Sequence, residues 1–206
     1  MWVWLVVLVI LALVLSSRTN IDYHVIHLSS RKDRLANIKK QRRKLFRPIH
    51  IFNAIGPSEH PHLRPGEYGC YQSHMKLYRK ISKRKGYSVI FEDDVDIQPG
   101  FHRKVESIIR RLKGKFDVVN LGNLDGNHGR RVFDDVYTVN PDKLMTGTHA
   151  YIVRNDRARR VVDLLESRMK EAFDIEIHKH IGNGIRGYVV YPSIAHQINS
   201  PSSIRV

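Results

Sequence analysis

The stretch "VIFEDDVDIQPG", residues 89–100, sets an apolar run directly before four acidic residues that fall within five positions. The apolar residues are typical of a buried strand that ends at the acidic cluster. Like charges this close repel one another, so something must compensate them. A metal ion, neighbouring Arg or Lys side chains and solvent are the three alternatives.

The segments on both sides of this stretch alternate between strands and helices. Strands are predicted at residues 23–28, 49–55, 87–91, 116–122, 132–139, 149–154 and 188–191. Helices are predicted from Ser29 or Ser30 to 45, at 67–84 and 101–114, from Asn155 or Asp156 to 169, and at 173–181. This alternation predicts a single α/β domain, a Rossmann-type, mostly parallel sheet flanked by helices. Ligands of such sheets bind beyond the carboxyl ends of the strands, which is where the acidic cluster lies.

The bulk composition limits the class of protein and of partner. A chain of 206 residues, 42% hydrophobic and 27% charged, fits one globular domain and excludes a disordered chain. The formal net charge of +15 predicts an anionic partner: nucleic acid, an anionic membrane surface or a phosphate-bearing substrate. Because Cys70 is the single cysteine, an intrachain disulfide is excluded.

The N-terminus differs from the rest of the chain. Residues 2–15, "WVWLVVLVILALVL", are uninterruptedly apolar. No basic residue precedes them and no clear small-x-small cleavage site follows, which favours an uncleaved anchor over a cleaved signal peptide or a buried core helix. We therefore expect a signal-anchor over 1–16, a linker over 17–22 and a folded domain over 23–206. We expect the protein to be located at the membrane, which its N-terminal segment would cross once. The sequence does not decide the orientation of that segment.

The acidic cluster has the spacing of a metal site. Glu92, Asp94 and Asp96 show both E-x-D and D-x-D spacing, and alternate residues of an extended segment point the same way. Their oxygen atoms suit a hard divalent ion such as Mn²⁺ or Mg²⁺, which usually keeps positions open for substrate phosphates. The alternative is a solvated acidic turn or the start of a helix.

Two neighbouring motifs could serve the same site. In "SSRKDR", Arg31 and Arg34 could reach a nucleotide phosphate, and in "GEYGCYQSH", Ser73 and His74 lie near the end of the sheet. Taken singly, the arginines also fit a solvated helix face, and the histidine fits a core residue with satisfied hydrogen bonds.

Taken in order, these segments resemble glycosyltransferase family 25, which includes lipooligosaccharide galactosyltransferases and collagen galactosyltransferase domains. The resemblance covers nearly everything after residue 22, and GExGCxxSH with EDDV is its strongest part. The segments that carry it are "VIHLSSRKDRLANI", "GEYGCYQSHMKLYRKI", "VIFEDDV", "DVVNLG", "GTHAYIVRNDRARRVV", "FDIEI", "YPSIAHQ" and "SPSSI".

The resemblance implies a GT-A-like fold, a UDP-galactose or UDP-glucose donor, a divalent metal and an inverting transfer. The acceptor would be a hydroxyl of a glycan, a lipooligosaccharide or a protein. Asp94, with Glu92 or Asp96, would hold the metal. Asp174 in "FDIEI" is the first candidate for the general base and Glu176 the second, although either could be an exposed carboxylate at a helix start.

The resemblance also points to residues nearer the C-terminus. His196 is a further candidate metal ligand, and Gln197 a candidate donor-binding residue. Residues of "MTGTHAY" are expected to line the donor or acceptor pocket, the alternative being a core strand: Thr146, Gly147, Thr148 and His149.

Two rival functions use the same features. One is a metal-dependent nuclease, and the other is a non-catalytic, membrane-tethered module that binds glycans or anions. The membrane-type N-terminus and the lack of an aromatic-basic motif count against nucleic acid, so we expect no nucleic-acid partner. The compact chain leaves the acceptor open.

Overall fold

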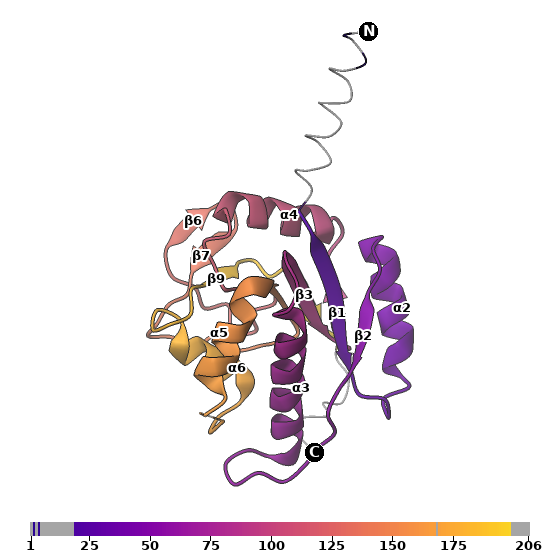
Figure 1. Cartoon of the computed structure of the whole chain (residues 1–206), viewed down its shortest axis with the longest axis vertical. Helices are drawn as coiled ribbons and strands as arrows, with labels where there is room; N and C mark the ends of the chain where they lie inside the picture. The colour runs from indigo at the N-terminus through magenta and orange to yellow at the C-terminus, as the bar shows by residue number, and fades with distance from the viewer. Residues whose placement is uncertain (1, 3, 5–18, 168, 199–206) are drawn as a thin grey trace.

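The computed structural model describes residues 19–167 and 169–198, together with Trp2 and Trp4 (Figure 1). Apart from these two tryptophans, the segment predicted as a signal-anchor lies outside the described residues. In the described part of the chain no helix is long and apolar enough to cross a membrane; the 17 residues of helix α3 (Pro65–Ile81) fall short of the ~20 that a span needs. This finding overturns the predicted single-pass membrane location.

The predicted alternation of strands and helices is present, with differences at short elements. Residues 132–139 were predicted as one strand but form a hairpin, because the chain reverses at Asp134, whose φ is +39°. The strands are β1 (Ile21–His27), β2 (His50–Asn53), β3 (Tyr87–Glu92), β4 (Val95–Ile97), β5 (Val118–Asn120), β6 (Arg131–Phe133), β7 (Val136–Thr138), β8 (Ala150–Arg154), β9 (Gly187–Val190) and β10 (Ala195–Gln197). The remaining helices are α2 (Arg34–Leu45), α4 (Phe101–Leu112), α5 (Asn155–Leu165) and α6 (Phe173–His180).

The main sheet has the strand order β2-β1-β3-β8-β5-β9-β7-β6. Strands β2, β1, β3, β5, β9 and β6 run in one direction, and β8 and β7 run in the other. This confirms the predicted single α/β domain with a mostly parallel sheet. Because β8 is antiparallel to β3, with Phe91 opposite Ala150, the loop that precedes β8 lies beside the end of β3.

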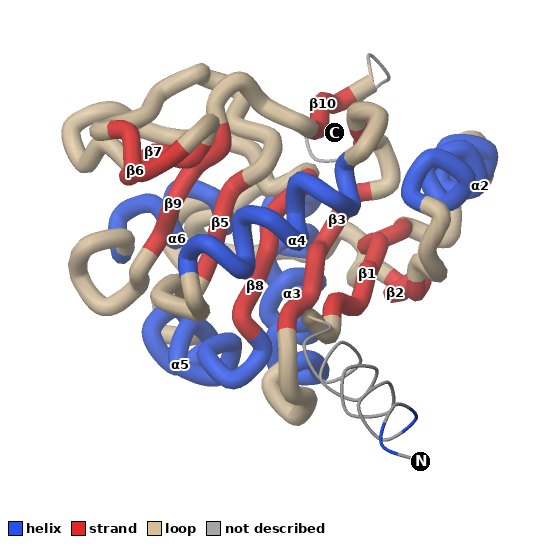
Figure 2. The backbone as a smooth tube through the Cα atoms, turned by 90° about the horizontal axis from the view of Figure 1, so that it is seen from above, coloured by secondary structure: helices blue, strands red, loops and turns tan. Residues whose placement is uncertain are grey.

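Helices cover both faces of this sheet. Helices α3, α5 and α6 lie on one face, and α4 crosses the other (Figures 1 and 2). Residues of α2 and α4, among them Ile38, Leu45 and Val105, belong to one buried core, and Tyr71, Met75 and other residues of α3 and α5 belong to the second. The burial of these apolar faces explains why the amphipathic segments fold as helices against the sheet.

A glycine lets α3 approach the loop after β2. A Cβ on Gly69 would lie 2.7 Å from the carbonyl oxygen of Gly56 and 2.8 Å from that of Ile55, so a larger residue does not fit. One turn on, Ser73 Oγ accepts a hydrogen bond from the Ile55 amide at 2.8 Å and donates one to the Gly69 carbonyl at 2.7 Å. The first half of α3 is thereby held at the carboxyl end of the sheet.

A second, two-stranded sheet joins the end of the chain to the acidic stretch. Strand β10 pairs antiparallel with β4, placing Ala195 opposite Ile97 and Gln197 opposite Val95. The amide of Ile198 also donates a hydrogen bond of 2.8 Å to the carbonyl of Asp94. Residues far apart in sequence thus form one wall beside the end of β3.

Candidate functional site

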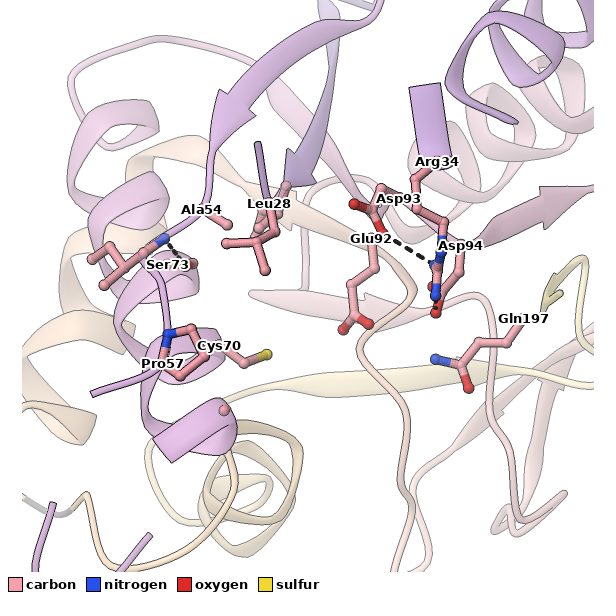
Figure 3. A pocket seen from close by; sticks show the side chains of 13 residues that line it. Leu28, Arg34, Ala54, Pro57, Cys70, Ser73, Glu92, Asp93, Asp94 and Gln197 are labelled. Atoms are coloured by element: carbon pink, nitrogen blue, oxygen red, sulfur yellow. Dashed lines mark hydrogen bonds and ion pairs between the residues drawn. The ribbon is translucent and has the colours of Figure 1, made fainter. Parts of the chain in front are cut away.

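A pocket opens where β3 ends, as the placement of the acidic cluster predicted (Figure 3). It encloses about 640 Å³ of space that no atom fills, part of it open to solvent. Its lining comes from the ends of β1 and β3, the start of α2, the loop after β2, helix α3 and strand β10. The polar or ionisable lining residues are Arg34, Cys70, Ser73, Glu92, Asp93, Asp94 and Gln197.

A buried arginine supplies part of the compensating charge. Arg34 is 3% exposed, and its Nη1 atom lies 3.1 Å from Asp93 Oδ1 and 3.0 Å from Asp94 Oδ2. The second oxygen of Asp93 lies 2.8 Å from His27 Nδ1. Arg34 therefore pairs with two of the four carboxylates, Asp93 and Asp94, and positions them from the pocket wall.

Asp94 has the properties of a group that needs a further partner. Its Oδ1 atom is buried and forms no hydrogen bond with any described residue. Burial, together with the neighbouring carboxylate of Glu92, raises the pKa of Asp94 to about 6. A hard divalent cation would satisfy this oxygen and return the group to its charged form, so the residues present fit such an ion.

Glu92 is held by residues other than the arginine that pairs with Asp93 and Asp94. Thr148 donates its hydroxyl to Glu92 Oε1, and His74 Nε2 lies 3.7 Å from the same oxygen. Burial acts to raise the pKa of Glu92, but His74 and the Thr148 hydroxyl outweigh it and hold the pKa below its usual value. His74 and Thr148, both predicted as residues of the site, thus contact the acidic cluster through Glu92.

Cys70 belongs to the site, although the sequence reasoning used it only to exclude a disulfide. Ligand atoms of Cys70, His74 and Glu92 all lie within 4.8 Å of one another, a grouping that could hold a metal ion. Burial raises the pKa of the Cys70 thiol well above its ordinary value, and Glu92 adds to the effect. The i, i+4 spacing of Cys70 and His74, which places both on one helix face, was the signal that could have revealed this.

The loop before β8 is fixed by polar contacts. Asp174 Oδ2 accepts a hydrogen bond of 2.9 Å from the Gly147 amide, and its Oδ1 accepts one from Ile175 at 3.0 Å. Thr146 donates its amide and its hydroxyl to Asp125, at 2.7 Å and 2.6 Å. The candidate base Asp174 is thereby joined to the segment that carries Thr148.

His149 lies beneath this segment rather than in the pocket. It is 1% exposed, and its Nε2 atom lies 3.2 Å from the Ala195 carbonyl at the start of β10. Burial lowers the pKa of this histidine. Its ring fills the space over Gly122, where a Cβ would come within 2.1 Å of Nε2. The residue therefore connects the β8 loop to the wall made by β10.

Some predicted site residues lie elsewhere. Asp96 points away from the pocket toward α2, where Lys44 Nζ lies 2.6 Å from Oδ1, and His196 faces Asp96 across the β4–β10 pair. Arg31 forms an ion pair of 2.8 Å with Asp33 and is not among the residues that line the pocket.

The second candidate base is also remote from the pocket. Glu176 is 5% exposed, and its Oε1 atom accepts a hydrogen bond of 3.4 Å from the amide of Lys170. Its contacts are with the segment that precedes α6, and it is not part of the pocket lining.

Comparison with known proteins extends these observations. The chain is 35% identical over 68 residues to Procollagen galactosyltransferase 1-A of Xenopus laevis, a match that covers 30% of this chain and 11% of that protein. The crystal structure of a glycosyltransferase involved in the glycosylation of the major capsid of PBCV-1 is similar in fold. Its TM-score is 0.51 at 10% identity, over 88% of this chain and 94% of that one. This likeness confirms the predicted GT-A-like fold.

Residues 20–198 match the model of "Glycosyltransferase family 25 (LPS biosynthesis protein)". The match includes the acidic stretch, the Cys70–His74 turn of α3 and Gln197. The chain therefore belongs to glycosyltransferase family 25, as its motifs predicted, and its enzyme class is that of a glycosyltransferase.

Proposed function

We propose that the protein transfers a galactose or glucose unit from a UDP-sugar to an acceptor hydroxyl with inversion at the anomeric carbon. The observation that carries this proposal is the pocket at the end of β3. It sets the buried, unpartnered Oδ1 atom of Asp94 beside Glu92 in a chain of family 25. The pocket lies where a GT-A-like sheet binds its ligand.

Glu92 and Asp94 are the residues we propose to hold Mn²⁺ or Mg²⁺. When bound, such an ion supplies positive charge that stabilises a leaving diphosphate. Arg34 keeps Asp94 in place and Thr148 keeps Glu92 in place. Because Asp96 and His196 face away from the pocket, we propose no metal ligation by either.

The donor would lie along the remaining polar lining. Gln197 on β10 and Ser73 on α3 face the pocket from opposite walls. Arg31 is partly exposed and its ion-pair partner Asp33 is exposed, so this is the arginine we propose to reach a diphosphate, whereas Arg34 is buried against Asp93 and Asp94. Phosphate binding by an arginine at the end of a sheet also fits the net charge of +15.

In the transfer step, the acceptor oxygen forms a bond to the anomeric carbon while the bond from that carbon to the diphosphate oxygen breaks. The electron pair leaves with UDP, and the acceptor proton moves to a general base. Neither candidate base is among the residues that line the pocket. We propose Asp174 as this base, because it is half-buried and holds the Gly147 amide in the loop before β8, whereas Glu176 is buried against the segment before α6.

The test is UDP release by the purified chain given UDP-galactose or UDP-glucose, with Mn²⁺ or with a chelator, and with a panel of glycan and protein acceptors. We expect metal-dependent release that Asp94→Asn abolishes. Asp174→Asn, which keeps one oxygen for the Gly147 amide, should lower kcat by ~10²-fold or more with little change in KM.

Two outcomes would contradict the proposal. If no donor is turned over and none shifts the melting temperature, the chain is a non-catalytic binding module on the same fold. If Asp174→Asn changes only KM, this carboxylate positions the Gly147 loop and is not the base.

A further inference from the structure

The pocket contains a second set of ligand atoms that differ in chemistry from the acidic cluster. Cys70 and His74 lie one turn apart on α3 and face the end of β3, where Glu92 begins the acidic run. Figure 3 shows the Cys70 sulfur and the Glu92 carboxylate directed toward one another across the pocket. We propose that these three residues bind a thiophilic divalent cation of the zinc class.

His74 provides the independent observation. The ring is fully buried and stacks on Phe173 with a centroid distance of 4.5 Å, so its orientation is fixed. Its Nδ1 atom lies 2.6 Å from the Tyr151 hydroxyl, and its Nε2 atom has no hydrogen-bond partner among the described residues. Glu92 Oε1, at 3.7 Å from Nε2, is too far for a hydrogen bond, and a metal ion bound between the two atoms would give this buried nitrogen a ligand bond. A metal-bound imidazole held through its other nitrogen is the usual arrangement.

The distances are close to those of a zinc site. Bond lengths to sulfur, nitrogen and oxygen place the ligand atoms of a tetrahedral zinc ion about 3.3–3.6 Å apart. His74 Nε2 and Glu92 Oε1 are 3.7 Å apart, and all three ligand atoms lie within 4.8 Å. Cys70 and Glu92 are partly exposed, so rotation of their side chains can close the remaining distance. With three protein ligands, the fourth ligand of such an ion would be water or substrate.

The donor set selects the ion. A thiolate and an imidazole favour zinc-class ions over Mn²⁺ or Mg²⁺, which prefer oxygen ligands such as Asp94. Binding requires the Cys70 thiol to lose its proton, so one proton is released for each ion bound. Glu92 belongs to both sets of ligands. A zinc-class ion therefore competes with Mn²⁺ or Mg²⁺ for Glu92 and inhibits turnover. Only this inhibition of turnover rests on the proposed function.

The test uses Co²⁺ as a spectroscopic substitute for zinc, added to the purified chain without any sugar donor. Because Cys70 is the single cysteine, a thiolate-to-cobalt charge-transfer band in the near ultraviolet can arise only from this site. We expect the band to appear on addition of Co²⁺ and to vanish when one equivalent of Zn²⁺ is added. Cys70→Ser should remove the band and weaken Co²⁺ binding by at least ~10-fold.

Matched variants separate a three-residue site from a reactive thiol. Glu92→Gln and His74→Gln should each weaken the band, and Asp94→Asn should leave it unchanged. If His74→Gln fails to fold in a melting experiment, Glu92→Gln carries the test alone. Absence of the band, or a band that Glu92→Gln leaves at full strength, would overturn the proposed site. Neither result depends on transferase activity.

Discussion

Replacement of Arg34 by Met tests how the acidic cluster is compensated. The guanidinium is 3% exposed and lies 3.0–3.1 Å from two carboxylates. At an effective dielectric constant of 20, each contact corresponds to about 5 kcal/mol of Coulomb attraction. Desolvation of the three charges offsets much of this in the intact protein. Among the described residues, removing only the cation leaves Asp93 with His27 as its partner and Asp94 with no ion pair, and such a change costs about 3–5 kcal/mol.

Urea unfolding at pH 7.5 in the presence of a chelator measures this cost. Circular dichroism is the suitable signal, because both tryptophans, at positions 2 and 4, precede the folded sheet. Arg31→Met is the matched control: its partner Asp33 has a side chain that is 60% exposed, so solvent screens the ion pair and we expect a smaller loss, of about 1 kcal/mol or less.

The pH dependence gives the second part of this test. Asp94 already has a pKa near 6 with Arg34 in place, and without the arginine its pKa rises further above that of the unfolded chain. The folded variant then binds more protons than the unfolded one, so its deficit should shrink as the pH falls from 7.5 to 5. A deficit below 1 kcal/mol, or one that stays constant with pH, would refute the account of Arg34 as the internal cation.

Two further perturbations address stability. Burial, and to a lesser degree His50, lowers the pKa of His24 to about 4. This pKa is below the unfolded value of 6.5. The contribution of neutral His24 to the free energy of unfolding is therefore complete above pH 6.5, and about 3 kcal/mol of that free energy is lost as the pH falls toward 4. His24→Phe should flatten that part of a stability-against-pH curve, and an unchanged curve would contradict the assignment. Gly122→Ala should cost about 1–3 kcal/mol by displacing the His149 ring, whereas Gly56→Ala, whose Cβ meets nothing within 4 Å, should change the unfolding free energy by less than about 0.5 kcal/mol.

The fold was largely predictable because its long elements bury apolar faces with clear periods. The elements that sequence reasoning missed, β4 and β10, are three residues each and exist because they pair with one another. Nothing local in "AHQ" indicates a strand. The hairpin at Asp134 was missed for a similar reason, since a positive φ at a non-glycine residue leaves no mark in a pattern of apolar positions.

The site was predictable in its location and less so in its members. The acidic run after an apolar strand predicted that Glu92 and Asp94 lie at the end of a strand, and both residues line the pocket at the end of β3; their role as metal ligands stays a prediction. The prediction that alternate residues of this segment point the same way, however, assumes an extended chain. The chain turns at Asp93 and Asp94, and Asp96 therefore pairs with Lys44 of α2. Whether a basic helix side chain or a metal ion takes a given carboxylate depends on tertiary packing, which spacing does not encode.

The pairing of β4 with β10 has a consequence for the order in which the molecule is completed. Residues 95–97 leave the ribosome about one hundred positions before their partners at 195–197, and closing so long a loop is slow. The remaining strands, up to Val190, can assemble the main sheet in the meantime. During synthesis the main sheet can thus form before Gln197 and strand β10 complete the pocket wall. The chain therefore becomes able to bind its ligand only after most of its fold has formed.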